Sequence, residues 1–185
     1  KSRDFSLLWA AGLISYFGSM ITYVAVPFQV KELTGSYVAV AISGLVEIVP
    51  LIIFGLYGGV LADALDRKKL IWVTELLSLL FTAILLINSM MDSPSLLLIY
   101  IVSGLFAATS GLRQPAMQAA LPRLVDHEDM TAAAALMSLR WQIGVIVGPA
   151  IGGVLISTYS VAVGYAADIA TFVISLALIA FMKNI

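Results

Sequence analysis

The chain has 185 residues, of which 61% are hydrophobic and only 11% are charged. Soluble domains carry about 25% charged residues, so a water-soluble fold could not bury this much apolar surface, and lipid is the expected solvent. The net charge of −1 argues against nucleic-acid binding, which requires a basic face. With no cysteine and a single histidine, His127, neither a disulfide nor a zinc site is expected.

Apolar stretches long enough to cross a bilayer as helices, about 20 residues each, recur six times along the chain. The predicted spans are about 6–30, 37–62, 70–90, 95–121, 130–156 and 161–182. The first stretch is too long for a signal-peptide core of about 7–15 residues, so we expect a retained helix there. We therefore predict an all-α membrane protein. No strong sequence repeat is visible, but the span lengths allow two three-helix units, 1–90 and 94–182, as in transporters with inverted repeats.

Basic residues beside the spans predict the orientation of the chain, because lysine and arginine accumulate in cytoplasmic loops. With the N-terminus inside, Lys31 is the one basic residue beside the spans that lies outside. The cytoplasmic set is then Lys1, Arg3, Arg67, Lys68, Lys69, Arg123 and Lys183. Both ends of this segment are therefore expected on the cytoplasmic side.

The connection after the second span, residues 58–69, reads GGVLADALDRKK. Glycines such as Gly59 let two helix ends approach closely, and Asp63 at the membrane edge is placed to cap a helix or pair with a base. Arg67 and Lys68 hold the connection on the cytoplasmic side. Taken alone, the stretch is also compatible with an ordinary positively charged turn.

Small residues recur at every fourth position of the fifth span. Gly144, Gly148 and Gly152 share one helix face, which predicts a smooth groove for another helix. Pro149 removes a backbone donor and favours a bend, and Gly153 extends the motif. A bare pattern of this kind indicates only packing, but the longer string is more specific.

These motifs resemble those of the major facilitator superfamily. Residues 59–68 resemble its signature loop between helices two and three, with Ala64 and Asp66 in place of the usual arginine and glycine. Residues 144–153 resemble, without a departure, the fifth-helix motif of its antiporter branch. Residues 113–125 resemble the corresponding segment of bacterial exporters of siderophores and macrolides. The resemblance covers the whole chain at the spacing of the family's N-terminal six helices.

The resemblance implies a secondary active transporter in the cell (inner) membrane, exporting a small amphipathic drug or siderophore by alternating access, driven by protons. Its expected partners are the lipid bilayer, a C-terminal six-helix half of the same polypeptide, the small-molecule substrate and protons, with no cofactor. In the family the fifth-helix groove packs against the second half. Two alternatives remain, a non-transporting six-helix scaffold and a homodimeric six-helix transporter. An enzyme is not expected, because no metal pair, nucleophile elbow or phosphate-binding loop is present.

Charged side chains inside the spans are candidate functional residues, because a charge at the centre of a membrane helix costs about 2.5–3.5 kcal/mol. Glu47 and Arg140 are both predicted near the midplane, where transporters bind substrate. We predict that they serve the substrate or proton pathway, with Tyr23 and Gln142 lining the cavity. The alternative is a static Glu47–Arg140 ion pair that locks the bundle.

The remaining charges in the spans are assigned structural roles. Arg113 is expected to form a cytoplasmic charge network with Glu75 or Asp63 rather than to contact substrate. Asp168 lies on a helix that the family places at the periphery, so a structural role is expected there as well.

Overall fold

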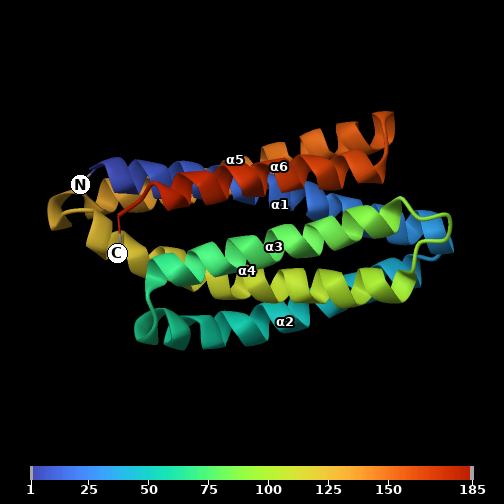
Figure 1. Ribbon diagram of the computed structural model, residues 1–185, viewed down its shortest axis with the longest axis horizontal. Coiled ribbons are helices and arrows are strands. Elements are labelled where there is room, and N and C mark those ends of the chain that lie inside the picture. The colour runs from blue at the N-terminus through green and yellow to red at the C-terminus, as the bar shows by residue number, and fades with distance from the viewer. Residues whose placement is uncertain (1, 184–185) are drawn as a thin grey trace.

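The computed structural model describes residues 2–183, except for the side chains of Ser2, Ala62 and Asp63. Within these residues, six helices are long and apolar enough to cross a membrane, which confirms the predicted all-α membrane fold (Figure 1). The helices are α1 Ser2–Thr34, α2 Tyr37–Ala64, α3 Arg67–Ser89, α4 Leu96–Leu124, α5 Met130–Thr158 and α6 Val161–Ala180, with a short 3₁₀ turn, η1 His127–Asp129, before α5.

Short polar side chains begin four of the helices. The side chains of Ser36, Ser95 and Ser160 each accept a hydrogen bond from the backbone N–H three residues later, at 3.3–3.4 Å, at the starts of α2, α4 and α6. Asp66 does the same for α3, accepting from the Lys69 N–H at 3.0 Å. Each cap satisfies a backbone donor that the first helical turn leaves free. Gly35, at φ +64°, turns the chain between α1 and α2.

The helices pack as two interlocked three-helix units. The first helix of the first unit, α1, packs mainly on α5 and α6 of the second unit. In the same way α4, the first helix of the second unit, packs on α2 and α3 of the first, and α3 packs on α6 between them. Figure 1 shows α3 and α6 side by side, with both chain ends at one end of the bundle. This exchange of partners is the arrangement expected of an inverted repeat.

Similar contacts join the two units near the starts of their helices. The Trp9 indole N–H of α1 donates to the backbone oxygen of Leu136 in α5 at 2.9 Å, and the Tyr100 hydroxyl of α4 donates to that of Ala39 in α2 at 2.9 Å. The tetrapeptide Gly-Gly-Val-Leu also occurs in both outer helices, at residues 58–61 of α2 and 152–155 of α5. The repeat that the sequence left undetected is therefore recognisable once the packing is known.

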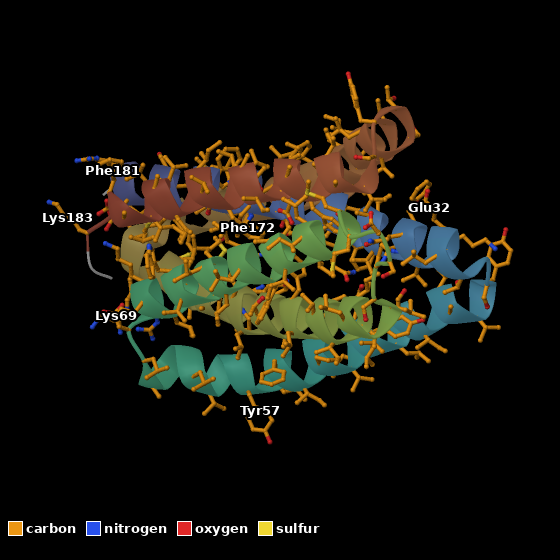
Figure 2. All side chains as sticks on the ribbon, turned by 45° about the vertical axis from the view of Figure 1, so that its right-hand side comes forward. Glu32, Tyr57, Lys69, Phe172, Phe181 and Lys183 are labelled. Carbon is orange, nitrogen blue, oxygen red and sulfur yellow. The ribbon has the colours of Figure 1, made fainter. Side chains whose placement is uncertain are left out.

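Apolar side chains remain exposed along α2, which packs along α4 and has little contact with the other helices. Figure 2 shows Tyr57 pointing away from the bundle, and its side chain is 64% exposed. Helix α5 is similarly open on the side away from α1. We use the term open face for the side of the bundle on which α2 and α5 flank α4 and α1.

Candidate substrate site

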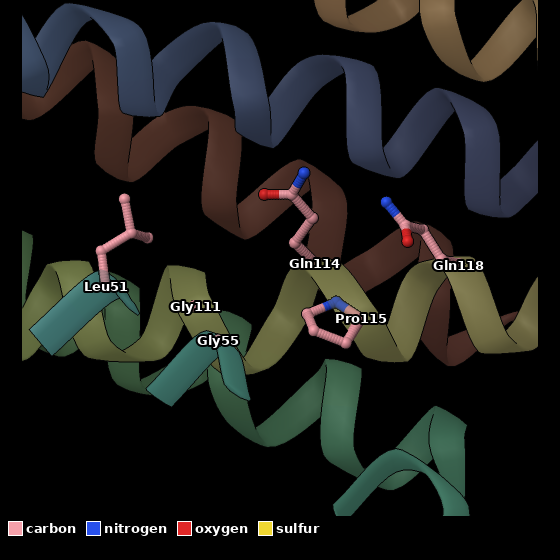
Figure 3. Close-up of a pocket in the computed structure, with 6 residues that line it drawn as sticks. All are labelled: Leu51, Gly55, Gly111, Gln114, Pro115 and Gln118. Carbon is pink, nitrogen blue, oxygen red and sulfur yellow. The ribbon is translucent and has the colours of Figure 1, made fainter. Parts of the chain in front are cut away.

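A hollow of about 280 Å³ lies between α2 and α4 on the open face. Its lining residues are Leu51, Gly55, Gly111, Gln114, Pro115 and Gln118 (Figure 3). The helices approach closely here because Gly111 has no side chain: an added Cβ would lie 2.7 Å from the Leu51 backbone oxygen and 2.9 Å from the Gly55 nitrogen. The amides of Gln114 and Gln118, one turn apart, project to the same side of α4 and are exposed.

The two glutamines were not among the predicted site residues. The signal available in the sequence was the presence of two amides, four residues apart, within a predicted membrane span. Amides at this spacing share a helix face and need hydrogen-bond partners wherever they face hydrocarbon.

The structure brings Arg113 and Glu75 together inside the bundle. Arg113 Nη1 lies 3.1 Å from Glu75 Oε1, and both side chains are buried. The same carboxylate oxygen accepts a hydrogen bond from the Ser175 hydroxyl at 3.2 Å, and Arg113 also donates to the Ser15 hydroxyl at 3.5 Å. This network joins α1, α3, α4 and α6, so it ties the two repeats together.

Asp168 lies in the same interior layer, fully buried. Its Oδ2 accepts hydrogen bonds from the Thr22 hydroxyl of α1 at 2.5 Å and from the Thr82 hydroxyl of α3 at 3.3 Å. The Thr171 hydroxyl lies 3.3 Å from Oδ1. Gly18 makes room for this cluster, because an added Cβ would lie 1.9 Å from the Thr171 hydroxyl oxygen and 2.5 Å from Asp168 Oδ1. Helix α6 turns this carboxyl toward α1 and α3, an arrangement compatible with the structural role expected of Asp168.

Glu47 and Arg140 do not form an ion pair in this structure, so the static lock considered from the sequence is absent. Glu47 is half-buried on α2, without a hydrogen-bond or ion-pair partner among the described residues. Its charge interacts electrostatically with Tyr165, whose hydroxyl donates a hydrogen bond to Gln29 Oε1 at 2.8 Å. Arg140 Nη1 instead contacts the sulfur of Met117 at 3.6 Å.

The two neutral residues predicted for the cavity are both exposed. Tyr23, on α1, has 58% of its side chain exposed. Gln142 is exposed on α5, but residues two apart point to roughly opposite sides of a helix. Gln142 therefore points away from Arg140, and the structure does not bring these two together.

The signature loop connects α2 to α3 at the end of the bundle that holds both chain ends. Lys68 Nζ donates to the backbone oxygen of Met182, just after α6. Arg67 is the first residue of α3, and no neighbour lies within 4 Å of a Cβ added at Gly59. The side chain of Asp63 lies outside the described part of the chain. Asp66, where the family has glycine, caps α3, which gives this departure a structural purpose.

The fifth-helix groove is filled by α1 of the same chain. A Cβ added at Gly144 would lie 2.3 Å from the Tyr16 ring, and one at Gly148 would lie 2.4 Å from the Cβ of Met20. A Cβ at Gly152 would lie 3.1 Å from the Cα of Ile21. The prediction that this face packs against a second bundle is therefore wrong here, because α1 and α5 approach at these glycines.

The two other residues named in the motif, Pro149 and Gly153, behave differently. Gly153 faces open space, with nothing within 4 Å of an added Cβ, and Pro149 lies inside α5 without ending it. The open side of α5 thus begins immediately beside the buried glycine face.

Comparison with known proteins matches the whole chain, residues 1–185, to the family described as transmembrane secretion effector. The chain is also 34% identical over 164 residues to the enterobactin exporters EntS of Citrobacter koseri, Salmonella choleraesuis and Escherichia coli O1:K1. These alignments cover 87% of this chain but 39% of each relative, so the chain spans about two-fifths of their length. The relatives are named as exporters. The chain therefore belongs to the transmembrane secretion effector family, within the siderophore and drug efflux branch of the major facilitator superfamily.

Proposed function

We propose that this chain is the N-terminal half of a secondary active exporter that moves a small amphipathic compound, of the siderophore or drug type, out of the cytoplasm in exchange for protons. The second half would be a six-helix bundle of the same polypeptide, covering the open face. The two bundles would rock against each other and expose the site alternately to the two sides of the membrane.

The observation that carries this proposal is the pair of exposed amides, Gln114 and Gln118, on the open face. Hydrocarbon offers an amide no hydrogen-bond partner, and leaving it unsatisfied costs several kcal/mol. A face that is apolar at its flanks and carries amides at its centre suits a water-filled cavity covered by a second bundle. It does not suit a surface in contact with lipid.

Glu47 is the residue that we propose to carry the proton. It lies within the span of α2, is half-buried, and has no described cation or hydrogen-bond donor to hold its charge. A carboxyl in that position can change its protonation as the surrounding helices move. Arg113 and Glu75 already neutralise each other and are assigned a structural role.

The expected orientation places both ends of this segment in the cytoplasm. Figure 2 shows Lys69 and Lys183 at one end of the bundle and Glu32 at the other. The basic side of the bundle would then face the cytoplasm, and substrate would enter from that end.

The test is transport by the complete protein in inside-out membrane vesicles, with enterobactin as the first probe and an imposed proton gradient as the driving force. We expect gradient-dependent accumulation, its loss in Glu47→Gln, and its retention in Glu32→Gln, which removes an exposed carboxylate at the end of α1. Gradient-driven transport by Glu47→Gln at the wild-type rate would eliminate Glu47 as the proton carrier. If the wild type transports neither enterobactin nor amphipathic drugs, the scaffold alternative gains support.

A further inference from the structure

Arg140 occupies a position built between three helices. It projects from α5, and its Nη1 atom reaches the sulfur of Met117 on α4. On α1, Gly12 provides the space, because a Cβ added there would lie 2.1 Å from Nη1 and 3.1 Å from Cζ of the guanidinium. One turn earlier on α5, the Leu136 backbone oxygen accepts the Trp9 indole N–H, which holds α5 against α1. The guanidinium is therefore held in place rather than free to extend along the membrane.

The hydrogen-bonding capacity of this guanidinium is almost entirely unused. Its Nε is buried without a partner, and a thioether sulfur at 3.6 Å is a weak acceptor for Nη1. No carboxylate of the described residues lies within ion-pair distance of it. Arg113, one helix away, differs, because Glu75 and Ser15 occupy its donors.

The electrostatic surroundings of Arg140 also lack a compensating anion of their own. The ionisable groups that interact with it at longer range are Arg113, Tyr16 and Glu75. Glu75 is already paired with Arg113, and Tyr16 is a neutral phenol at ordinary pH. A cation within a membrane span normally faces a partner or marks a substrate pathway.

The position of Arg140 connects it to the open face. Met117, which it touches, lies about one turn after Gln114 on α4, because residues three apart are neighbours on a helix. The arginine is itself only partly buried. A planar guanidinium can grip an oxyanion with two parallel hydrogen bonds.

We propose that Arg140 binds an acidic oxygen group of the exported compound, a carboxylate or an ionised phenol, so that the substrates of this transporter are anionic amphipathic molecules. This inference rests on the proposed function, because it assigns the chemistry of the exported compound.

The test measures binding and transport separately, using the complete protein with two fluorescent probes, anionic carboxyfluorescein and cationic ethidium. For binding to the purified protein, we expect wild type to prefer carboxyfluorescein and Arg140→Gln to bind it at least tenfold more weakly, with ethidium affinity unchanged or higher. Arg140→Lys should keep part of the affinity, since it retains the charge without the planar fork. The matched control Arg123→Gln removes an exposed arginine at the end of α4 and should bind both probes like wild type.

Thermal unfolding separates this role from a structural one. If Arg140 is an unpaired cation that awaits substrate, Arg140→Gln should unfold at the wild-type temperature or above it, whereas loss of a structural ion pair would lower that temperature. Wild-type carboxyfluorescein affinity in Arg140→Gln, or no carboxyfluorescein binding by the wild type, would overturn the inference. Binding of the anion with no transport in vesicles would instead contradict the proposed function and leave the anion site standing.

Discussion

Substituting Gly148 by alanine should separate α5 from α1, because the added methyl group has no space. Its carbon would lie 2.4 Å from the Cβ of Met20 and 3.0 Å from the Phe17 backbone oxygen. Both obstacles are fixed to the α1 backbone, so no rotamer change relieves them. Such overpacking costs about 1–3 kcal/mol.

Gly153→Ala is the matched control, since it makes the same chemical change five residues along the same helix. Nothing lies within 4 Å of the added carbon there. Replacing glycine by alanine inside a helix favours the helix by up to about 1 kcal/mol, and this gain applies to both variants. Comparing the two therefore isolates the clash, and Gly148→Ala should be less stable than Gly153→Ala by about 1–3 kcal/mol.

The assay is thermal or denaturant unfolding of the purified complete protein, followed by transport in vesicles. Gly148→Ala should unfold at a lower temperature or denaturant concentration than Gly153→Ala. The larger side chain of Gly148→Leu should abolish export, because α5 can no longer close on α1. The stability of Gly152→Ala should lie between those of Gly148→Ala and Gly153→Ala, since the Cβ added at residue 152 would lie 3.1 Å from the Ile21 Cα. Equal stability of the Gly148 and Gly153 alanine variants would refute the reasoning from close approach.

Two further predictions concern the buried polar layer. Arg113→Gln and Glu75→Gln should each destabilise the protein by about 3–5 kcal/mol, because each leaves a buried charge unpaired. The double variant that combines Arg113→Gln with Glu75→Gln should lose less than the sum of the two single changes. Unfolding of the four proteins measures this, and simple additivity would show that the pair is not coupled. Gly18→Ala should displace Asp168 and Thr171 and lower the unfolding temperature, whereas Gly44→Ala, which meets nothing within 4 Å, should not. Equal unfolding temperatures would contradict the tight packing of the Asp168 cluster.

Hydropathy predicted the helices because membrane insertion depends on local composition. Long apolar stretches broken by capping residues such as Ser36, Asp66, Ser95 and Ser160 define helices independently of what they pack against. The same local information carried the family resemblance, since the motifs at 59–68 and 144–153 are contiguous in the chain. Fold class and family could therefore be predicted from the sequence.

Partners across helices could not be predicted in the same way. Depth estimates placed Glu47 and Arg140 at similar levels, but depth leaves the rotation of a helix about its axis undetermined. The structure turns Arg140 toward Gly12 and Met117, and it turns Asp168 inward to three threonines. The hollow beside Gln114 was missed for the same reason, because it exists only where α2 and α4 meet.

Contiguous residues are enough to identify six membrane helices and a transporter family. The packing of the helices was needed to learn that the glycine face of α5 receives α1, that Glu75 neutralises Arg113, and that Arg140 is left without an anion. The two kinds of information differ because the membrane selects helices by composition alone. Their mutual rotation is fixed by close packing at glycines and by the need to satisfy each buried charge.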